Sequence, residues 1–194
     1  MASFVPEVFI IESLTEIDEE NKRQEGDMLS KILTLDLKKP IYKYVRSKIE
    51  FEKALQEYKK SRYRYLHISA HGSKDAIYMT NDDRISHDDL AGMLHNVIRH
   101  RRLFISSCFV VNSHLAKKLQ SCHLFTLVGM DEKISFSKAA LIWASLYHIL
   151  FELDDKMSAK RIEKCLQDLS KLFDFKIKMF HYDHNDDYKL SKLL

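Results

Sequence analysis

The sequence predicts a three-layer α/β domain, with about six mostly parallel strands between helices on both faces. Short apolar runs alternate along the chain with longer segments in which apolar residues recur every three or four positions, the spacing of a helix. Parallel neighbours need crossover connections, so strands separated by helices favour a parallel sheet. No repeat or linker interrupts this alternation in the 194 residues, which predicts a single domain over residues 1–194.

The first elements are two strands, each followed by a helix. The run 8–11 is continuously apolar, which is typical of a strand buried on both faces. An acidic loop then leads into a helix over 21–33, and the segment 41–45 alternates with the period of a strand. Ser47 and Glu50 have the spacing of a capping box, so they predict the start of the next helix.

The middle of the chain supplies the two central strands. A strand is predicted over 63–69, followed by a small hairpin over 76–86. Acidic residues then begin a helix over 88–98, as expected for a helix N-terminus. The strand over 103–107 follows and ends in a polar segment.

The last elements repeat the alternation. A short helix over 113–120 precedes a strand over 124–129. The helix over 137–153 is apolar on most sides and should be the most buried one. An amphipathic helix over 160–173 and a final strand over 175–179 complete the domain.

Glycine and cysteine usage excludes several classes of protein. The 4 glycines are too far apart for a dinucleotide-binding loop or a P-loop. The 3 cysteines are not a disulfide framework, and the apolar run near the N-terminus has no basic segment before it and ends at Glu12, so it is neither a signal peptide nor a membrane span. We therefore expect a cytoplasmic protein with no membrane contact.

Neither the distribution of charge nor the spacing of possible metal ligands predicts a nucleic-acid or metal site. The net charge is +3, although 38–64 and 99–102 are locally basic. We favour solvated faces for these clusters over a phosphate-binding surface, and we do not expect direct contact with nucleic acid. The histidine and cysteine spacings fit no zinc pattern, so the expectation is no metal and no cofactor.

Two reactive residues follow the central strands directly. His71 and Gly72 come after the strand over 63–69, and Cys108 comes after the strand over 103–107. The carboxyl ends of parallel strands meet at one edge of a sheet, where ligands bind. A histidine beside a cysteine can stabilise a thiolate nucleophile and later protonate a leaving group. The amides of Gly72 and Cys108 are candidates for an oxyanion hole, because a residue without a Cβ allows close approach.

These segments resemble the caspase-like (clan CD) cysteine peptidases, and among them the CHAT family. The matching pieces are HISAHG, the hairpin IYMTNDDRIS, the strand end LFISSC, and FTLVGM followed by the helix AALIWASLYHIL. The resemblance implies a caspase-like sandwich, a catalytic dyad of His71 and Cys108, and an oxyanion hole formed by the Gly72 and Cys108 amides. Members that cut after Arg or Lys use an acidic pocket residue, for which Asp131 and Glu132 are the candidates.

The chain departs from the caspase pattern around the nucleophile. Caspases carry QACxG there, with the histidine about 50 residues upstream, whereas this chain has Ser106-Ser107-Cys108 followed by Phe109-Val110-Val111 and a shorter separation from His71. The bulky residues after Cys108 replace the small or polar ones usual in CHAT domains. They put the shape of the substrate pocket in question.

The predicted function is that of a cysteine endopeptidase cleaving a protein substrate. We expect it to be the effector or protease subunit of a partner-regulated defence system, such as an antiviral one, or of a stress system, with a regulatory protein partner. The alternative is a catalytically inactive caspase-like module that binds or scaffolds a partner. A weaker third possibility is nucleic-acid binding through the two basic clusters.

Overall fold

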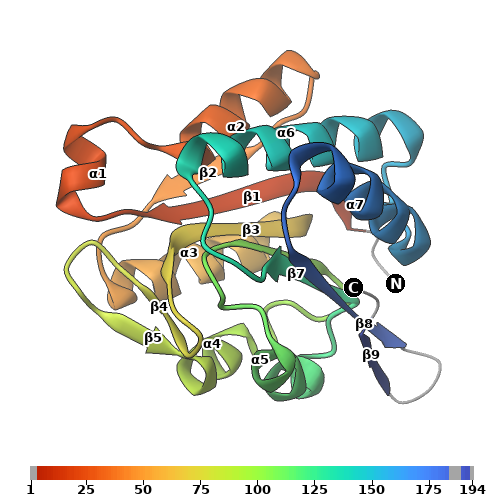
Figure 1. The fold of residues 1–194 in the computed structure, drawn as a ribbon. Helices are drawn as coiled ribbons and strands as arrows, with labels where there is room; N and C mark the ends of the chain where they lie inside the picture. The colour runs from red at the N-terminus through yellow and green to blue at the C-terminus, as the bar shows by residue number, and fades with distance from the viewer. Residues whose placement is uncertain (1–3, 184–188, 193–194) are drawn as a thin grey trace.

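The computed structural model describes residues 4–183 and 189–192. Its main sheet has the strand order β2-β1-β3-β6-β7-β8-β9 (Figure 1). Neighbours from β2 to β7 are parallel, whereas β8 and β9 are antiparallel to their neighbours. The strand bounds are β1 Val5–Ser13, β2 Ile41–Tyr44, β3 Tyr63–Gly72, β6 Arg102–Ser106, β7 Thr126–Met130, β8 Ile177–Asp183 and β9 Lys189–Lys192.

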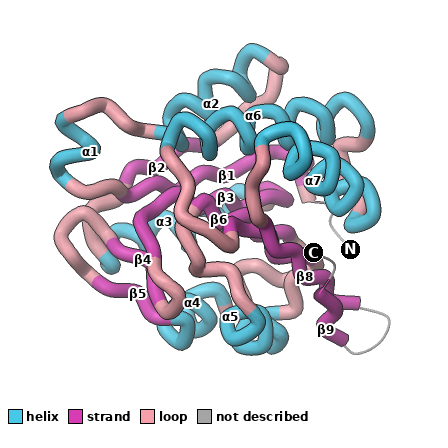
Figure 2. Tube along the Cα trace, viewed as in Figure 1, coloured by secondary structure: helices cyan, strands magenta, loops and turns pink. Residues whose placement is uncertain are grey.

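Helices cover both faces of this sheet, which confirms the predicted three-layer α/β arrangement (Figures 1 and 2). One face carries α2 (Glu25–Leu35), α6 (Phe136–Leu153) and α7 (Ala159–Phe173). The other carries α3 (Lys48–Ser61), α4 (His87–Leu94), α5 (Ser113–Lys118) and the 3-10 turn η1 (Leu119–Cys122). The hairpin of β4 (Ala76–Tyr78) and β5 (Arg84–Ser86) pairs with the end of β3.

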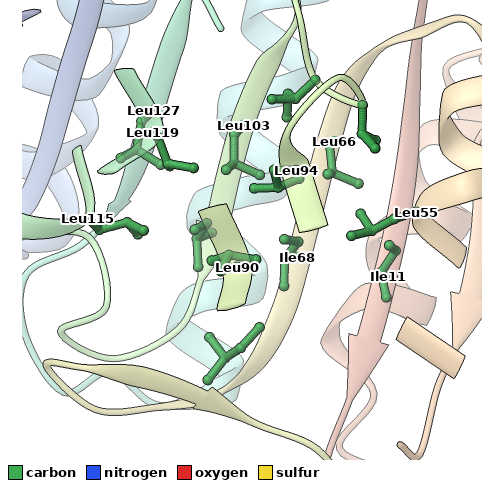
Figure 3. Packing of buried hydrophobic residues seen from close by; sticks show 14 of the residues in the cluster. Ile11, Leu55, Leu66, Ile68, Leu90, Leu94, Leu103, Leu115, Leu119 and Leu127 are labelled. Carbon is green, nitrogen blue, oxygen red and sulfur yellow. The ribbon is translucent and has the colours of Figure 1, made fainter. Parts of the chain in front are cut away.

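Successive side chains of β1 point to opposite faces of the sheet, and both faces are buried, which explains why its apolar run is continuous. Val8 and Ile10 pack with α2 and α6, while Phe9 and Ile11 pack on the opposite face. A strand buried on both faces needs apolar residues at every position. Figure 3 shows the second of these cores, which contains Ile11 together with leucines of α3, α4 and α5.

The N-termini of α3 and α4 are capped by serine side chains, but only the α4 cap is a complete capping box. The Ser47 hydroxyl accepts from the Glu50 amide at 3.3 Å, as predicted, but the Glu50 carboxylate accepts from the amide of Arg46 at 2.6 Å instead of closing the box on Ser47. Ser86 and Asp89 form a complete capping box at α4.

Besides small shifts in strand bounds, the structure differs from the sequence prediction in three places. The acidic loop after β1 contains a short helix, α1 (Glu16–Glu20), and Lys22 at φ 55° ends it, so α2 begins at Glu25. α4 stops at Leu94, four residues before the predicted end, because Asn96 has a φ of 59°. β9 is a seventh strand of the main sheet and has no counterpart in the prediction.

The basic cluster at 99–102 is not a solvated face, because two of its arginines are buried. Arg101 is 4% exposed and donates to the carbonyls of Tyr58 and Lys59 at the end of α3, each at 2.9 Å. Arg102 is 7% exposed and donates to the hydroxyl of Thr126. Burial lowers the pKa of Arg102 to about 10. Both side chains tie strands and helices together and are unavailable to phosphate.

A helix must be both long and apolar to cross a membrane. Within residues 4–183 and 189–192, no helix combines the length and the apolar character needed to cross a membrane.

Candidate active site

His71 and Cys108 lie at the carboxyl edge of the sheet, on adjacent strands. The last paired residues of β3 and β6 are Ser69 and Ser106, and His71 and Cys108 each lie two positions further along their strands. Both line one cleft of about 640 Å³, together with Asp18. The structure therefore places both residues of the predicted dyad in one cleft.

The cleft has walls from the segments that follow four parallel strands. β1 is followed by α1, which holds Asp18; β3 ends at His71, β6 leads to Cys108, and β7 leads into the start of α6. The wall from the last segment includes Phe136, whose ring lies edge-on to His71 with centroids 5.5 Å apart. The full lining is Asp18, Arg23, Glu25, Ala70, His71, Ser106, Ser107, Cys108, Lys133, Ile134, Ser135, Phe136, Ser137 and Ala139.

Asp18 is a site residue that the sequence prediction did not include. Its carboxylate lies 2.7 Å from Nε2 of His71, and it also accepts from Thr15 at 2.7 Å and from Arg23 at 2.9 Å. Burial raises the pKa of Asp18, but these hydrogen bonds outweigh burial and hold the pKa below its ordinary value. An ionised Asp18 accepts a hydrogen bond from Nε2–H, which leaves the lone pair on Nδ1 of His71.

The chain turns sharply immediately after Cys108. Phe109 has a φ of 62°, a conformation that costs free energy for a bulky residue. Val110 and Val111 are fully buried in the core on the α3 side of the sheet. These valines therefore do not crowd the cleft; they anchor the turn that presents Cys108.

Gly72 allows this turn to lie against β3. A Cβ at position 72 would be 2.1 Å from Oγ of Ser107 and 2.4 Å from Cγ2 of Val110. Because Ser73 donates to the Ala76 carbonyl, the alternation of an antiparallel ladder makes Gly72 a non-hydrogen-bonded position opposite Ile77. The Gly72 N–H therefore points away from β4.

Glu25 is a second site residue that the prediction did not include. It is 4% exposed and lines both the cleft and an adjoining groove of about 880 Å³. Its Oε2 accepts from the hydroxyls of Ser106 at 2.8 Å and Ser69 at 3.3 Å. Its Oε1 has no hydrogen-bond partner among the described residues, and His67 Nε2 is 3.7 Å from it. Glu25 thus places a buried carboxylate at the floor of the cleft, with Oε1 itself buried beside His67.

Asp131 and Glu132, the acids expected in the substrate pocket, face β8. Asp131 forms an ion pair with Lys178, and Glu132 accepts from the amide of Lys176 at 3.1 Å. The segment after β7 contributes to the cleft only from Lys133 onward. Both acids connect this loop to the sheet.

The remaining cysteines lie in the interior. Cys122 is 1% exposed and Cys165 is 7% exposed, and burial raises the pKa of each thiol to about 11. Thiols with such pKa values stay protonated near neutral pH. In the described part of the chain, no three His, Cys, Asp or Glu side chains are grouped so as to hold a metal ion.

No family model and no curated protein matches the sequence. Solved structures do match the fold. A secreted C11 cysteine protease from Bacteroides thetaiotaomicron, iotapain, has a TM-score of 0.66 at 10% identity, over 93% of this chain and 67% of that chain. A secreted C11 protease from the same organism, in complex with an irreversible peptide inhibitor, has a TM-score of 0.61 at 10% identity, over 92% and 66%.

The third structure is the complex of the pro- and mature domains of RgpB from Porphyromonas gingivalis. It has a TM-score of 0.54 at 13% identity, over 89% of this chain and 47% of that chain. The chain thus spans about two thirds of the C11 protease chains and about half of the RgpB chain. A particular likeness to CHAT domains stays a prediction. The chain has the mostly parallel α/β fold of the caspase-like, clan CD cysteine peptidases.

Proposed function

We propose that this protein is a cysteine endopeptidase that uses Cys108 as its nucleophile. The observation that carries the proposal is the meeting of Cys108 with the His71–Asp18 pair in one cleft. The cleft lies at the carboxyl edge of a sheet whose fold is shared with cysteine proteases. The thiol is half-buried and lines the cleft, so a peptide can reach it.

The proposed reaction uses His71 as the proton carrier. Asp18 holds the Nε2–H tautomer, so Nδ1 takes the proton of Cys108 and leaves a thiolate. The sulfur attacks the peptide carbonyl, a C–S bond forms, and His71 returns the proton to the departing amine as the C–N bond breaks. Water then attacks the thioester with His71 as base, which releases the acid product and the free thiol.

The oxyanion of the tetrahedral intermediate needs two hydrogen-bond donors. The amides of Gly72 and Cys108 are the proposed donors, and two features support this assignment. The Gly72 N–H points away from β4, and the missing Cβ lets the Ser107–Cys108 segment approach it.

The cleft floor favours a cationic substrate side chain. Glu25 lines the cleft with a buried carboxylate, and a lysine or arginine side chain that enters the cleft can interact with it electrostatically. Asp131 and Glu132 are weaker candidates for this contact, because they bind Lys178 and the Lys176 amide. We therefore propose cleavage after Arg or Lys.

Fluorogenic peptides that differ only at the residue before the cleaved bond test the function. The wild type should cleave peptides with Arg or Lys there, whereas Cys108→Ala and His71→Ala should be inactive. Cys122→Ala is the matched control, because its thiol is buried away from the cleft. Glu25→Gln should lose most of the preference for a cationic residue. Binding of a partner with no cleavage of any peptide would favour the inactive scaffold instead.

Regulation is a separate proposal. Control by a protein partner, in a defence or stress system, stays a prediction. It is contradicted if the purified chain cleaves these peptides at full rate with no partner, ligand or processing.

A further inference from the structure

The N-terminus of α2 receives its cap from a neighbouring strand. The side chain of Gln24, at the N-cap position, makes no capping hydrogen bond. Instead, the carboxylate of Glu12 on β1 accepts from the amide of Gly26 at 2.7 Å and from the amide of Asp27 at 3.3 Å. A carboxylate at this end also interacts favourably with the helix dipole. Glu12 therefore holds the first turn of α2 in place.

Close packing adds to this restraint. Glu12 is fully buried, and Tyr42 on β2 donates to its Oε2 at 2.7 Å. A Cβ at Gly26 would lie 3.0 Å from Cγ2 of Ile10 and 3.2 Å from Cβ of Glu12. The start of α2 thus rests directly on β1, with little space for movement.

The first turn of α2 is also the floor of the candidate cleft. Glu25 precedes Gly26, and Ser69 lies between the two carboxylates, with its hydroxyl 3.3 Å from Glu25 and 3.5 Å from Glu12. We propose that Glu12 is a positioning residue for the cleft: by capping α2, it keeps the Glu25 carboxylate where a cationic substrate side chain meets it. The inference rests on the proposed function, which assigns the cleft floor to that side chain.

Charge makes the same arrangement sensitive to pH. The titratable groups facing Glu12 are Glu25 and Asp27 on α2 and Tyr42 on β2, while β3 presents the neutral Ser69. Burial, with a smaller contribution from the charge of Glu25, raises the pKa of Glu12 to about 7 despite its hydrogen bonds. A cation bound at Glu25 favours the ionised form of Glu12, so substrate affinity should fall as the pH decreases below about 7.

Steady-state kinetics of Glu12→Gln give the first test. With an Arg-containing peptide at pH 8, we expect KM to rise about tenfold while kcat changes less than about twofold, because ground-state positioning is lost and the dyad is intact. KM of the wild type should also rise from pH 8 to pH 6, and that of Glu12→Gln should not. Glu52→Gln, on the exposed side of α3, is the matched control. A Glu12→Gln enzyme with the KM and pH dependence of the wild type would overturn the proposal.

A second measurement does not depend on activity. The amide resonances of Gly26 and Asp27 in the wild type should shift with pH, with a midpoint near neutrality, and these shifts should disappear in Glu12→Gln. If the wild type cleaves no peptide but the resonances titrate, the proposed function fails, and what stands is that Glu12 caps α2. Resonances that do not titrate, in an active enzyme, would refute the positioning role alone.

Discussion

The carboxylate of Asp18 lies 2.7 Å from Nε2 of His71, although the two residues are 53 positions apart in the sequence. Thr15 and Arg23 hold the same carboxylate from either side of it in the chain. The loop after β1 is thus built around one acid that fixes the orientation and tautomer of one imidazole. This restraint matters because 41% of the His71 side chain is exposed.

Asp18→Asn tests whether this pair contributes to catalysis. An asparagine keeps the size of the side chain but cannot stabilise an imidazolium, so we expect kcat/KM to fall roughly 100-fold. Asp36→Asn is the matched control, because Asp36 accepts from His148 at 2.9 Å on the surface of the molecule. Equal kcat/KM values for Asp18→Asn and the wild type would remove Asp18 from the mechanism.

Substitution of Gly72 by alanine can be compared with the same substitution at Gly92. A Cβ at Gly72 would overlap Ser107 and Val110, whereas a Cβ at Gly92 in α4 meets nothing within 4 Å. Gly72→Ala should therefore lower the free energy of unfolding by about 1–3 kcal/mol and displace the segment that carries Cys108. Gly92→Ala should raise it by up to about 1 kcal/mol, as expected for a glycine in a helix. Chemical denaturation measures both, and an equally stable, fully active Gly72→Ala protein would contradict the assigned packing.

The architecture could be predicted from the sequence, because the spacing of apolar residues along a strand or helix shows which of its faces are buried. The continuous apolar run of β1 predicts burial on both faces, and its residues lie in both cores. The apolar helix α6 predicts strong burial, and seven of its residues are buried, most of them in one core. The positions of His71 and Cys108 also followed from one rule, that functional groups come after parallel strands. Both residues line the cleft, as expected.

The same rule applies to β1, and this is where the prediction was incomplete. Asp18 and Glu25 follow that strand, but in an acidic segment a buried carboxylate looks no different from an exposed one. Only the folded contacts identify them: Arg23 and His71 for Asp18, and Ser106 for Glu25. The burial of Arg101 could not be predicted from the sequence either, because its partners are backbone carbonyls at the end of α3.

The proton on Glu12 should make stability depend on pH. Its pKa is about 7 in the folded protein and 4.5 ordinarily, so the folded state keeps a proton that the unfolded chain releases between these values. The contribution of this group to the free energy of unfolding therefore falls as the pH rises through that window. From pH 5 to pH 8, the wild type should lose about 2–3 kcal/mol relative to Glu12→Gln. Urea denaturation at both pH values measures it, and parallel curves for the two proteins would contradict the buried proton.

Alkylation distinguishes Cys108 from the two interior thiols. Iodoacetamide needs an accessible thiolate, and Cys108 lines the cleft whereas Cys122 and Cys165 are buried with pKa values of about 11. At pH 8 the folded wild type should therefore gain a single adduct, and Cys108→Ala should gain none. His71→Ala should label more slowly, because the imidazole that takes the thiol proton is missing. Intact-protein mass spectrometry counts the adducts, with urea-unfolded protein as the control in which all 3 cysteines react. A folded Cys108→Ala protein that still labels would mean that an interior thiol opens to solvent, and reactivity would then no longer identify the nucleophile.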